Sequence, residues 1–317
     1  MNKDFKKIIY LGPQEKLSFV EDKLDKFNVI YASNEIDVLN HLKNCFAILD
    51  ASMKIKFDQE LLIKAESLKV FVAATTGSSH IDSNYLDSKK IPLLTLKGER
   101  KLLNNITPAA ELSWLLLLMC ARNAYEAVNH VKDGKWDRNQ FPGIMLNGKT
   151  IGVIGLGRLG MWTVRYANAF GLKCLGYDPF LKEDPLHVKK CSLEELLQKS
   201  DFVSVHVNYD PNKPKILTKE HFNLMKKGVI IINTSRGELI DEDSLLNGLI
   251  SGDIAGAGLD VLSGEPNVEE NQLFIQRNSD LNLIITPHIG GFSYDALGKV
   301  LEFCCSRIID FDLNGTY

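Results

Sequence analysis

Short, nearly continuous apolar runs alternate with longer segments of helical periodicity along most of the chain. This alternation is typical of βαβ units, in which helices cover a parallel sheet. A first series of strands is predicted at residues 7–11, 27–31, 47–50, 70–74 and 93–96. A second series is predicted at residues 151–155, 173–177, 202–207, 229–233, 256–261 and 283–286. The pattern therefore predicts an α/β protein with two parallel sheets.

A long helix is predicted between the two series. Residues 104–122 are apolar on most sides of that helix, as expected for a helix between two bodies or two subunits. A final helix follows the last strand of the second series. We therefore expect a discontinuous outer domain, residues 1–103 with 292–317, and a second domain, residues 104–291, with the site formed by their closure. The helix is also the best candidate for a homodimer contact, with burial inside one subunit as the alternative.

Composition excludes several classes of protein. The 317 residues suggest two domains, and 37 Lys and Arg against 40 Asp and Glu give no basic excess for nucleic acid. The longest apolar stretch, residues 112–121, is about half of a membrane span, and the charged N-terminus resembles no signal peptide. Six cysteines form no CxxC pair. Cys304 and Cys305 have no His or Cys at ligand spacing. We expect a cytoplasmic protein without a metal or a membrane or nucleic-acid partner.

A glycine-rich turn follows the first strand of the second series. Gly155 allows a tight turn, Gly157 lets the backbone approach a pyrophosphate, and Gly160 lets the following helix pack on the strand. The helix N-terminus then faces the phosphates. Asp178 ends the next strand, 18 residues beyond Gly160, where it would accept hydrogen bonds from the adenosine ribose. The predicted cofactor-binding residues here are Gly155, Gly157, Arg158, Leu159, Gly160 and Asp178.

The cofactor is predicted to be NAD rather than NADP. Asp178 would repel a 2′-phosphate, and the next three residues, 179–181, include no arginine to neutralise one. Lys182 is the cation that lies nearby.

Three further polar segments follow the last strands. They read Asn-Thr-Ser-Arg-Gly at 233–237, Asp-Val-Leu-Ser-Gly-Glu-Pro at 260–266, and Thr-Pro-His-Ile-Gly-Gly at 286–291. With the glycine turn, and in this order, they resemble the D-isomer-specific 2-hydroxyacid dehydrogenase family, including its phosphoglycerate dehydrogenase-like members. The resemblance implies a doubly wound Rossmann domain with a smaller flavodoxin-like substrate domain. It also implies NAD-dependent interconversion of a 2-keto acid and a D-2-hydroxy acid.

The residue types suit this chemistry. Reduction of a 2-keto acid needs a cation for the carboxylate, a group that polarises the ketone, and a proton donor. The planar guanidinium of Arg236 can supply the first two, and His288 can supply the proton. Glu265 beside His288 would favour the imidazolium form. Arg236, Glu265 and His288 are therefore the predicted catalytic residues.

Other roles come from the resemblance. It implies that Asp260 touches the nicotinamide side of the cofactor and that backbone amides of Thr76, Gly77 and Ser78 hold the substrate carboxylate. His206 is expected to line the cofactor cleft, with a structural core role as the alternative. Thr234 and Gly290 complete the predicted cofactor contacts. For five other histidines a surface loop is the simpler interpretation, although one of them, His80, could face substrate; they are His41, His80, His130, His187 and His221.

The chain departs from the family pattern at Asn208, where proline is usual, and at Thr75, where glycine is usual. The segment after Gly98 is also several residues longer than in common members. Lys97, Arg100 and Lys101 in that segment could bind a second anionic group on the substrate. A solvated turn in which a neighbouring glutamate, Glu99, offsets part of the charge is the alternative.

Other activities stay open. Glu265 argues against formate oxidation, which usually pairs the histidine with glutamine. Phosphite oxidation uses the same residue types. An NAD-sensing co-regulator that keeps the fold and the catalytic residues is the hypothesis from another class.

Overall fold

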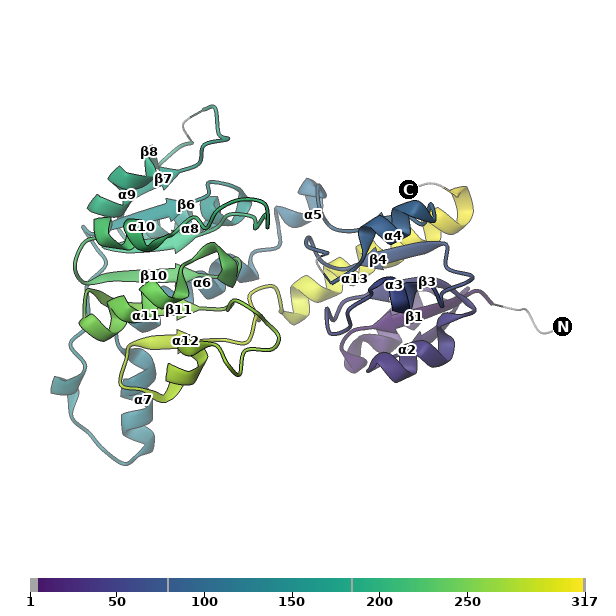
Figure 1. The fold of residues 1–317 in the computed structure, drawn as a ribbon, viewed down its shortest axis with the longest axis horizontal. Coiled ribbons are helices and arrows are strands. Elements are labelled where there is room, and N and C mark those ends of the chain that lie inside the picture. Colours follow the sequence, from purple (N-terminus) through teal and green to yellow (C-terminus); the bar gives the residue numbers. More distant parts are fainter. Residues whose placement is uncertain (1–4, 79, 184, 316–317) are drawn as a thin grey trace. The chain divides into compact units, whose positions relative to one another are not determined.

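The computed structural model describes residues 5–78, 80–183 and 185–315 (Figure 1). The chain divides into two compact units. The first comprises Met1–Ile106 and Ser293–Tyr317, and the second comprises Thr107–Phe292.

The first unit contains a five-stranded parallel sheet in the order β2-β1-β3-β4-β5. Neighbouring residues of a strand face opposite sides, so Ile9 packs in one core and Ile8 in another. Helix α13, from the end of the chain, packs on the Ile8 side beside β4 (Figure 1). The strands are β1 (Lys7–Leu11), β2 (Asn28–Tyr31), β3 (Cys45–Asp50), β4 (Val70–Ala73) and β5 (Leu93–Leu94). The helices are α1 (Leu17–Lys23), α2 (Glu35–Leu42), α3 (Gln59–Leu62), α4 (Ser83–Ser88), α5 (Arg100–Leu103) and α13 (Tyr294–Asn314), with a 3-10 turn at Gln14–Lys16.

The second unit contains a seven-stranded parallel sheet in the order β12-β11-β10-β9-β6-β7-β8. The strands are β6 (Thr150–Ile154), β7 (Lys173–Tyr177), β8 (Lys189–Lys190), β9 (Phe202–Val205), β10 (Val229–Asn233), β11 (Ile254–Leu259) and β12 (Leu283–Ile285). The chain starts at β6 and runs outward in both directions, so the strand order reverses between β6 and β9. Open α/β sheets bind ligands at the carboxyl ends of strands at such a reversal.

Helices cover both faces of this second sheet. The helices of this unit are α6 (Pro108–Ala121), α7 (Ala124–Lys132), α8 (Arg158–Ala169), α9 (Leu193–Lys199), α10 (Lys219–Leu224), α11 (Glu242–Ser251) and α12 (Gln272–Ile275), of which α7 packs on α6 and not on the sheet. Three 3-10 turns lie at Arg138–Gln140, Gly237–Leu239 and Gln276–Asn278. The buried side chains of the strands divide into two apolar clusters, one for each face.

The long predicted helix is interrupted in the structure. Pro108 occupies the first position of α6, where its fixed φ and missing N–H are tolerated, so the helix begins there and not at residue 104. Among the described residues, the wider stretch Arg100–Ala121 has 22 residues and is apolar enough, by length and composition alone, to cross a membrane. The apolar run at residues 112–121 is only part of this stretch. Core helices of globular proteins satisfy the same criterion, and α6 packs against β10, β11 and α8.

Candidate active site

Three loops at neighbouring strand ends of the second sheet carry the predicted catalytic residues. Arg236 lies three residues beyond β10, Glu265 six residues beyond β11, and His288 three residues beyond β12. Because β10, β11 and β12 are adjacent and parallel, their carboxyl ends share one edge.

The structure brings His288 and Glu265 together. His288 Nδ1 lies 2.7 Å from Glu265 Oε1, a charge-assisted hydrogen bond when the imidazole is protonated. The two side chains are 36% and 25% exposed, so a small molecule can reach them. His288 has a φ of +53°, a left-handed conformation that costs energy for a residue other than glycine. The surrounding loop must therefore hold this backbone in place.

The carboxylate of Asp260 holds residues 286–290, the histidine loop that carries His288, in place. Its Oδ1 accepts hydrogen bonds from Thr286 Oγ1 at 2.6 Å and from the Ile289 N–H at 2.8 Å. Its Oδ2 accepts the Gly290 N–H at 2.7 Å, and its backbone carbonyl accepts the His288 N–H at 2.9 Å. Burial raises the pKa of Asp260, because desolvation disfavours the charged form, while these hydrogen bonds act in the opposite direction. The carboxylate thus organises the backbone on both sides of His288.

The loop that carries Arg236 is built on a buried asparagine. Asn233 Oδ1 accepts the Ser235 N–H at 3.0 Å, and Asn233 Nδ2 donates to the carbonyl of Arg236 at 2.8 Å. Arg236 Nη1 donates to the Ser235 carbonyl at 2.7 Å. Within the described part of the chain, no hydrogen bond or ion pair joins Arg236 to Glu265 or to His288. The structure thus places Arg236 on the same edge of the sheet without a polar contact to either residue among those described.

The glycine turn has the geometry that a dinucleotide needs. Gly155 has a φ of +91°, and a Cβ there would lie 2.5 Å from the carbonyl oxygen of His206. A Cβ on Gly160 would overlap the carbonyl oxygen of Gly155, so the start of α8 packs tightly on the turn. At Gly157, by contrast, a Cβ would meet no protein atom within 4 Å. The turn is therefore closed toward the protein and open at Gly157, at the N-terminus of a twelve-residue helix, as pyrophosphate binding requires.

Asp178 and Arg158 lie at this turn. Asp178 Oδ2 accepts the Leu156 N–H at 3.0 Å and Oδ1 accepts the Phe180 N–H at 3.0 Å, so the carboxylate is fixed beside the turn. Burial lowers the pKa of Arg158, the first residue of α8. Leu159 follows it on the helix. The N-terminus of α8, with Arg158, fits the pyrophosphate of NAD, and the carboxylate of Asp178 fits its adenosine ribose.

His206 lies at the reversal of strand order. Its Nε2 is 2.8 Å from Ser204 Oγ and 3.0 Å from Thr163 Oγ1, whereas its Nδ1 is buried and has no hydrogen-bond partner in the structure. Burial lowers the pKa of His206 to about 4, because desolvation disfavours the imidazolium. Thr234 Oγ1 lies 2.6 Å from Ser113 Oγ on α6. This contact fixes the start of the arginine loop, residues 234–237, which carries Arg236.

The first unit contains the other predicted contact, at the carboxyl end of β4. Thr75 Oγ1 donates to the carbonyl of Gly77 at 2.7 Å, which shapes the turn of Thr76, Gly77 and Ser78. The sequence suggested that His80 lies in a surface loop, but the structure shows it largely buried. Its side chain is 10% exposed, and Nε2 lies 2.8 Å from Oδ2 of the buried Asp50 at the end of β3.

Sequence reasoning missed acidic residues that hold loops in the two units. Asp50 and Glu242 are examples. Each is an acidic residue at a strand end or in a first helical turn, where such residues commonly cap the backbone or complement the helix dipole. Asp50 also caps the adjacent Ser52, but the contacts of Asp50 with His80 and of Glu242 with Ser263 join segments distant in sequence. Nothing in the local pattern indicates those contacts.

The comparisons agree with the geometry. The sequence model of the "D-isomer specific 2-hydroxyacid dehydrogenase, NAD binding domain" matches residues 114–290. The chain is 34% identical to a hydroxypyruvate reductase of Thermotoga maritima over 289 residues, covering 90% of this chain and 88% of that protein. It is 38% identical to a D-3-phosphoglycerate dehydrogenase of Methanocaldococcus jannaschii over 76% of this chain and 45% of that one. The chain therefore spans about half the length of that relative.

A solved structure gives the same result. The D-lactate dehydrogenase of Aquifex aeolicus, complexed with NAD and lactic acid, superposes with a TM-score of 0.82 at 28% identity. The superposition covers 97% of this chain and 96% of that one. This protein belongs to the D-isomer specific 2-hydroxyacid dehydrogenase family, whose NAD-dependent members are oxidoreductases that interconvert 2-keto acids and D-2-hydroxy acids.

Proposed function

We propose that His288, Glu265 and Arg236 catalyse the NADH-dependent reduction of a small 2-keto acid to the D-2-hydroxy acid, and the reverse oxidation. The observation that carries these roles is the 2.7 Å contact between His288 Nδ1 and Glu265 Oε1 at an exposed sheet edge. Because Glu265 occupies Nδ1, Nε2 is the ring nitrogen that exchanges a proton with the substrate oxygen. Glu265 holds the ring in place and stabilises the imidazolium until that transfer.

Arg236 provides the positive charge. Its planar guanidinium can bind a carboxylate through two parallel hydrogen bonds and polarise a neighbouring ketone oxygen. When bound, NADH supplies the hydride for reduction.

Kinetics of two variants test these roles. His288→Ala removes the proton donor and should lower kcat for reduction by about 100-fold or more, with NADH affinity within a few-fold of wild type. Glu265→Gln keeps the shape of the side chain but removes its charge. It should move the pH at which reduction falls by half to a lower value. Near-normal kcat in His288→Ala would remove His288 from the mechanism.

The cofactor preference rests on Asp178. Its fixed carboxylate can accept hydrogen bonds from ribose hydroxyls, worth ~1.5–3 kcal/mol, and repels a 2′-phosphate. We therefore expect kcat/KM for NADH to exceed that for NADPH by at least about tenfold. Equal values for both cofactors would show that Asp178 does not distinguish them.

Three cations near the start of α5 bear on the substrate class. Lys97, Arg100 and Lys101 are exposed, and no salt bridge involves any of them among the described residues. Glu99, the acidic residue among them, forms a salt bridge with Arg307 Nη1 on α13 at 3.1 Å, so part of its charge is compensated there. These three cations favour a keto acid with a second anionic group over pyruvate. A relative named D-3-phosphoglycerate dehydrogenase agrees with that class.

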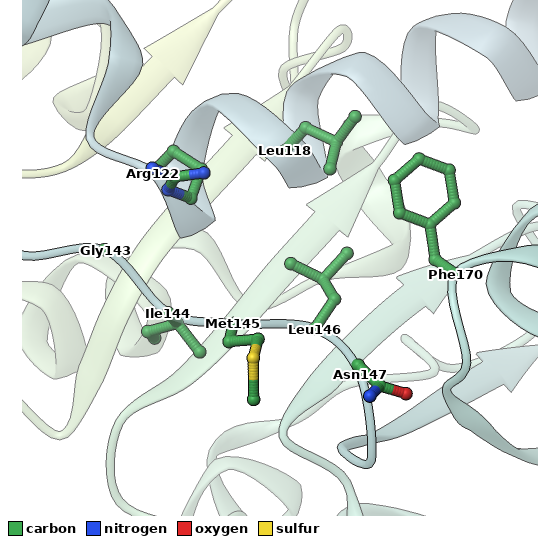
Figure 2. Close-up of a pocket in the computed structure, with 8 residues that line it drawn as sticks. All are labelled: Leu118, Arg122, Gly143, Ile144, Met145, Leu146, Asn147 and Phe170. Atoms are coloured by element: carbon green, nitrogen blue, oxygen red, sulfur yellow. The ribbon is translucent and has the colours of Figure 1, made fainter.

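A homodimer formed through α6, α7 and the segment after them is part of the proposal. α7 and this segment extend away from the sheet of their own unit (Figure 1). Leu118, Ile144, Leu146 and Phe170 line a hollow of about 480 Å³ beside Arg122 (Figure 2). Large apolar side chains of α6, of α7 and of the segment after them are exposed: Leu115, Tyr125, Val128, Val131, Trp136 and Met145. Apolar surface of this kind marks an interface in proteins of this size.

Light scattering tests the dimer. Wild type should have twice the chain mass at micromolar concentration. Met145→Glu should shift the protein toward the monomer, whereas Ile250→Glu, at an exposed position on α11, should not. A monomeric wild type would contradict the proposal.

The proposed compartment is the cytoplasm. All six cysteines are free thiols in the structure, and five of them are buried. Reduced cysteines of this kind fit a reducing compartment. Mass spectrometry of protein alkylated in the native host would show six free thiols if this is right and disulfides if it is wrong.

A further inference from the structure

Glu265 reaches His288 from a turn that a second glutamate holds in place. The turn, Ser263–Gly264, directly precedes Glu265, and Gly264 has a φ of +85°. Glu242, in the first turn of α11, accepts the Ser263 N–H through Oε1 at 2.8 Å. Its other oxygen, Oε2, accepts Asn271 Nδ2 at 2.7 Å. Both oxygens of Glu242 are therefore committed to this region.

Two more contacts tie the same turn to the arginine loop. A Cβ on Gly237, the residue after Arg236, would overlap the backbone between Leu262 and Ser263, so the two segments pack backbone to backbone. Glu238 Oε1 lies 3.5 Å from the Gly264 N–H. The segments that carry Arg236 and Glu265 thus form one block.

The carboxylate of Glu242 is energetically costly where it lies. Burial raises its pKa, and the nearby charge of Glu238 acts in the same direction, while the hydrogen bonds from Ser263 and Asn271 counteract both. An amide at this position could accept one of the two hydrogen bonds but would turn a donor toward the other. The site therefore favours a carboxylate although a charge is expensive there.

We propose that Glu242 is a positioning residue of the active site, which acts through the Ser263–Gly264 turn to hold Glu265 against His288. It does not touch substrate or cofactor in this role. The inference rests on the proposed pairing of Glu265 with a catalytic histidine.

The test follows the ionisation of the His288 ring and needs no substrate. In ¹⁵N-histidine-labelled protein, with His288 assigned by comparison with His288→Gln, the pH midpoint of its ring signals is measured by NMR. Charged groups that act on this ring are Glu265 and Asp260. Glu265→Gln should lower the midpoint, because the imidazolium loses its partner. Glu242→Ala should lower it in the same direction by a smaller amount.

Controls separate positioning from general damage. Asp243→Asn removes a charge from the same turn of α11 at an exposed position and should leave the midpoint unchanged. Glu242→Gln, which keeps the volume of the side chain, should lie between wild type and Glu242→Ala, and it replaces Glu242→Ala if that variant does not fold. In a Glu265→Gln background, Glu242→Ala should have no further effect.

The result that would overturn the inference is a wild-type midpoint in both Glu242 variants, or an equal shift with and without Glu265. The kinetic counterpart is a fall in kcat/KM of at least about fivefold in Glu242→Ala that disappears in the Glu265→Gln background. If no 2-keto acid is reduced by wild type, the proposed function fails while the NMR result still decides the role of Glu242.

Discussion

Asp260→Asn is the substitution that most sharply tests how the histidine loop is built. The change keeps the shape of a side chain that is 1% exposed and replaces one oxygen by an NH₂ group. If that group takes the place of Oδ2, it faces the Gly290 N–H, now 2.7 Å away, and two donors meet. If the amide is flipped, the same conflict arises at the Ile289 N–H, although the Thr286 hydroxyl can rotate to accept, so no orientation satisfies the loop.

The expected magnitude follows from these contacts. An unsatisfied buried N–H costs ~1–3 kcal/mol, and the remaining bonds lose the strength that the negative charge gave them. Removing a costly buried charge, which the raised pKa of Asp260 indicates, offsets part of this loss. We expect a net loss of about 2 kcal/mol in the free energy of unfolding, or a fall of about 4–8 °C in Tm. Because the strained backbone of His288 then relaxes, kcat should fall by at least about tenfold.

Thermal unfolding and steady-state kinetics measure the two effects, with Thr286→Val as the matched control. That variant removes one hydroxyl donor and leaves both backbone hydrogen bonds to Asp260, so it should lose less than half as much stability and activity. Wild-type Tm and kcat in Asp260→Asn would refute the reasoning that this carboxylate holds the loop.

Three other predictions follow from the structure. Gly157→Ala should leave Tm unchanged and weaken NADH binding by about tenfold or more, since its methyl group would enter only the space open to the cofactor. Gly160→Ala should lower both Tm and NADH affinity, because its methyl group overlaps the Gly155 carbonyl. Equal effects of the two variants on Tm would contradict this account of the glycine turn. The pKa of His206, about 4 in the folded protein, lies below its unfolded value of about 6.5, so the unfolded chain binds the proton first as pH falls. Stability should drop by about 2 kcal/mol between pH 7 and pH 5 from this group, and urea unfolding of His206→Gln should lack that part of the drop. Arg100→Ala should raise KM for a dianionic keto acid by about tenfold while KM for pyruvate changes less than twofold. Added salt should selectively weaken binding of the dianionic acid to wild type. Equal changes in the two KM values would assign the cations to a solvated turn.

The sequence predicted most of the fold because the strands of the second sheet are buried on both faces and read as continuous apolar runs. β8 was not predicted, since Lys189 and Lys190 form a two-residue strand at the sheet edge with no apolar pattern. The helix before the second sheet was predicted too long at its start. Pro108 is compatible with a helix only at its first turn, so the break at that residue follows from proline chemistry and not from the apolar pattern.

In the candidate site, too, some residues could be predicted from the sequence and others could not. Residues whose type carries the chemistry, such as His288 and the turn glycines, could be found because their spacing at successive strand ends is rare outside a dinucleotide-dependent site. The pairing of Glu265 with His288 was predicted from the residue types that the chemistry needs and from the family resemblance, and the structure gives its distance. Glu242 and Asp50 could not be found. Each acts on a segment distant in sequence, and an acidic residue at a strand or helix end has many ordinary roles.

The configuration of the product tests the central claim most directly. Purified protein is incubated with NADH and each member of a panel of small 2-keto acids, including one with a second anionic group, and the hydroxy acids are separated by chiral chromatography. The account predicts that at least one acid is reduced, with stoichiometric oxidation of NADH, to the D isomer alone, and that His288→Ala forms almost none. An L or racemic product, or no reduction of any acid by wild type, would contradict it.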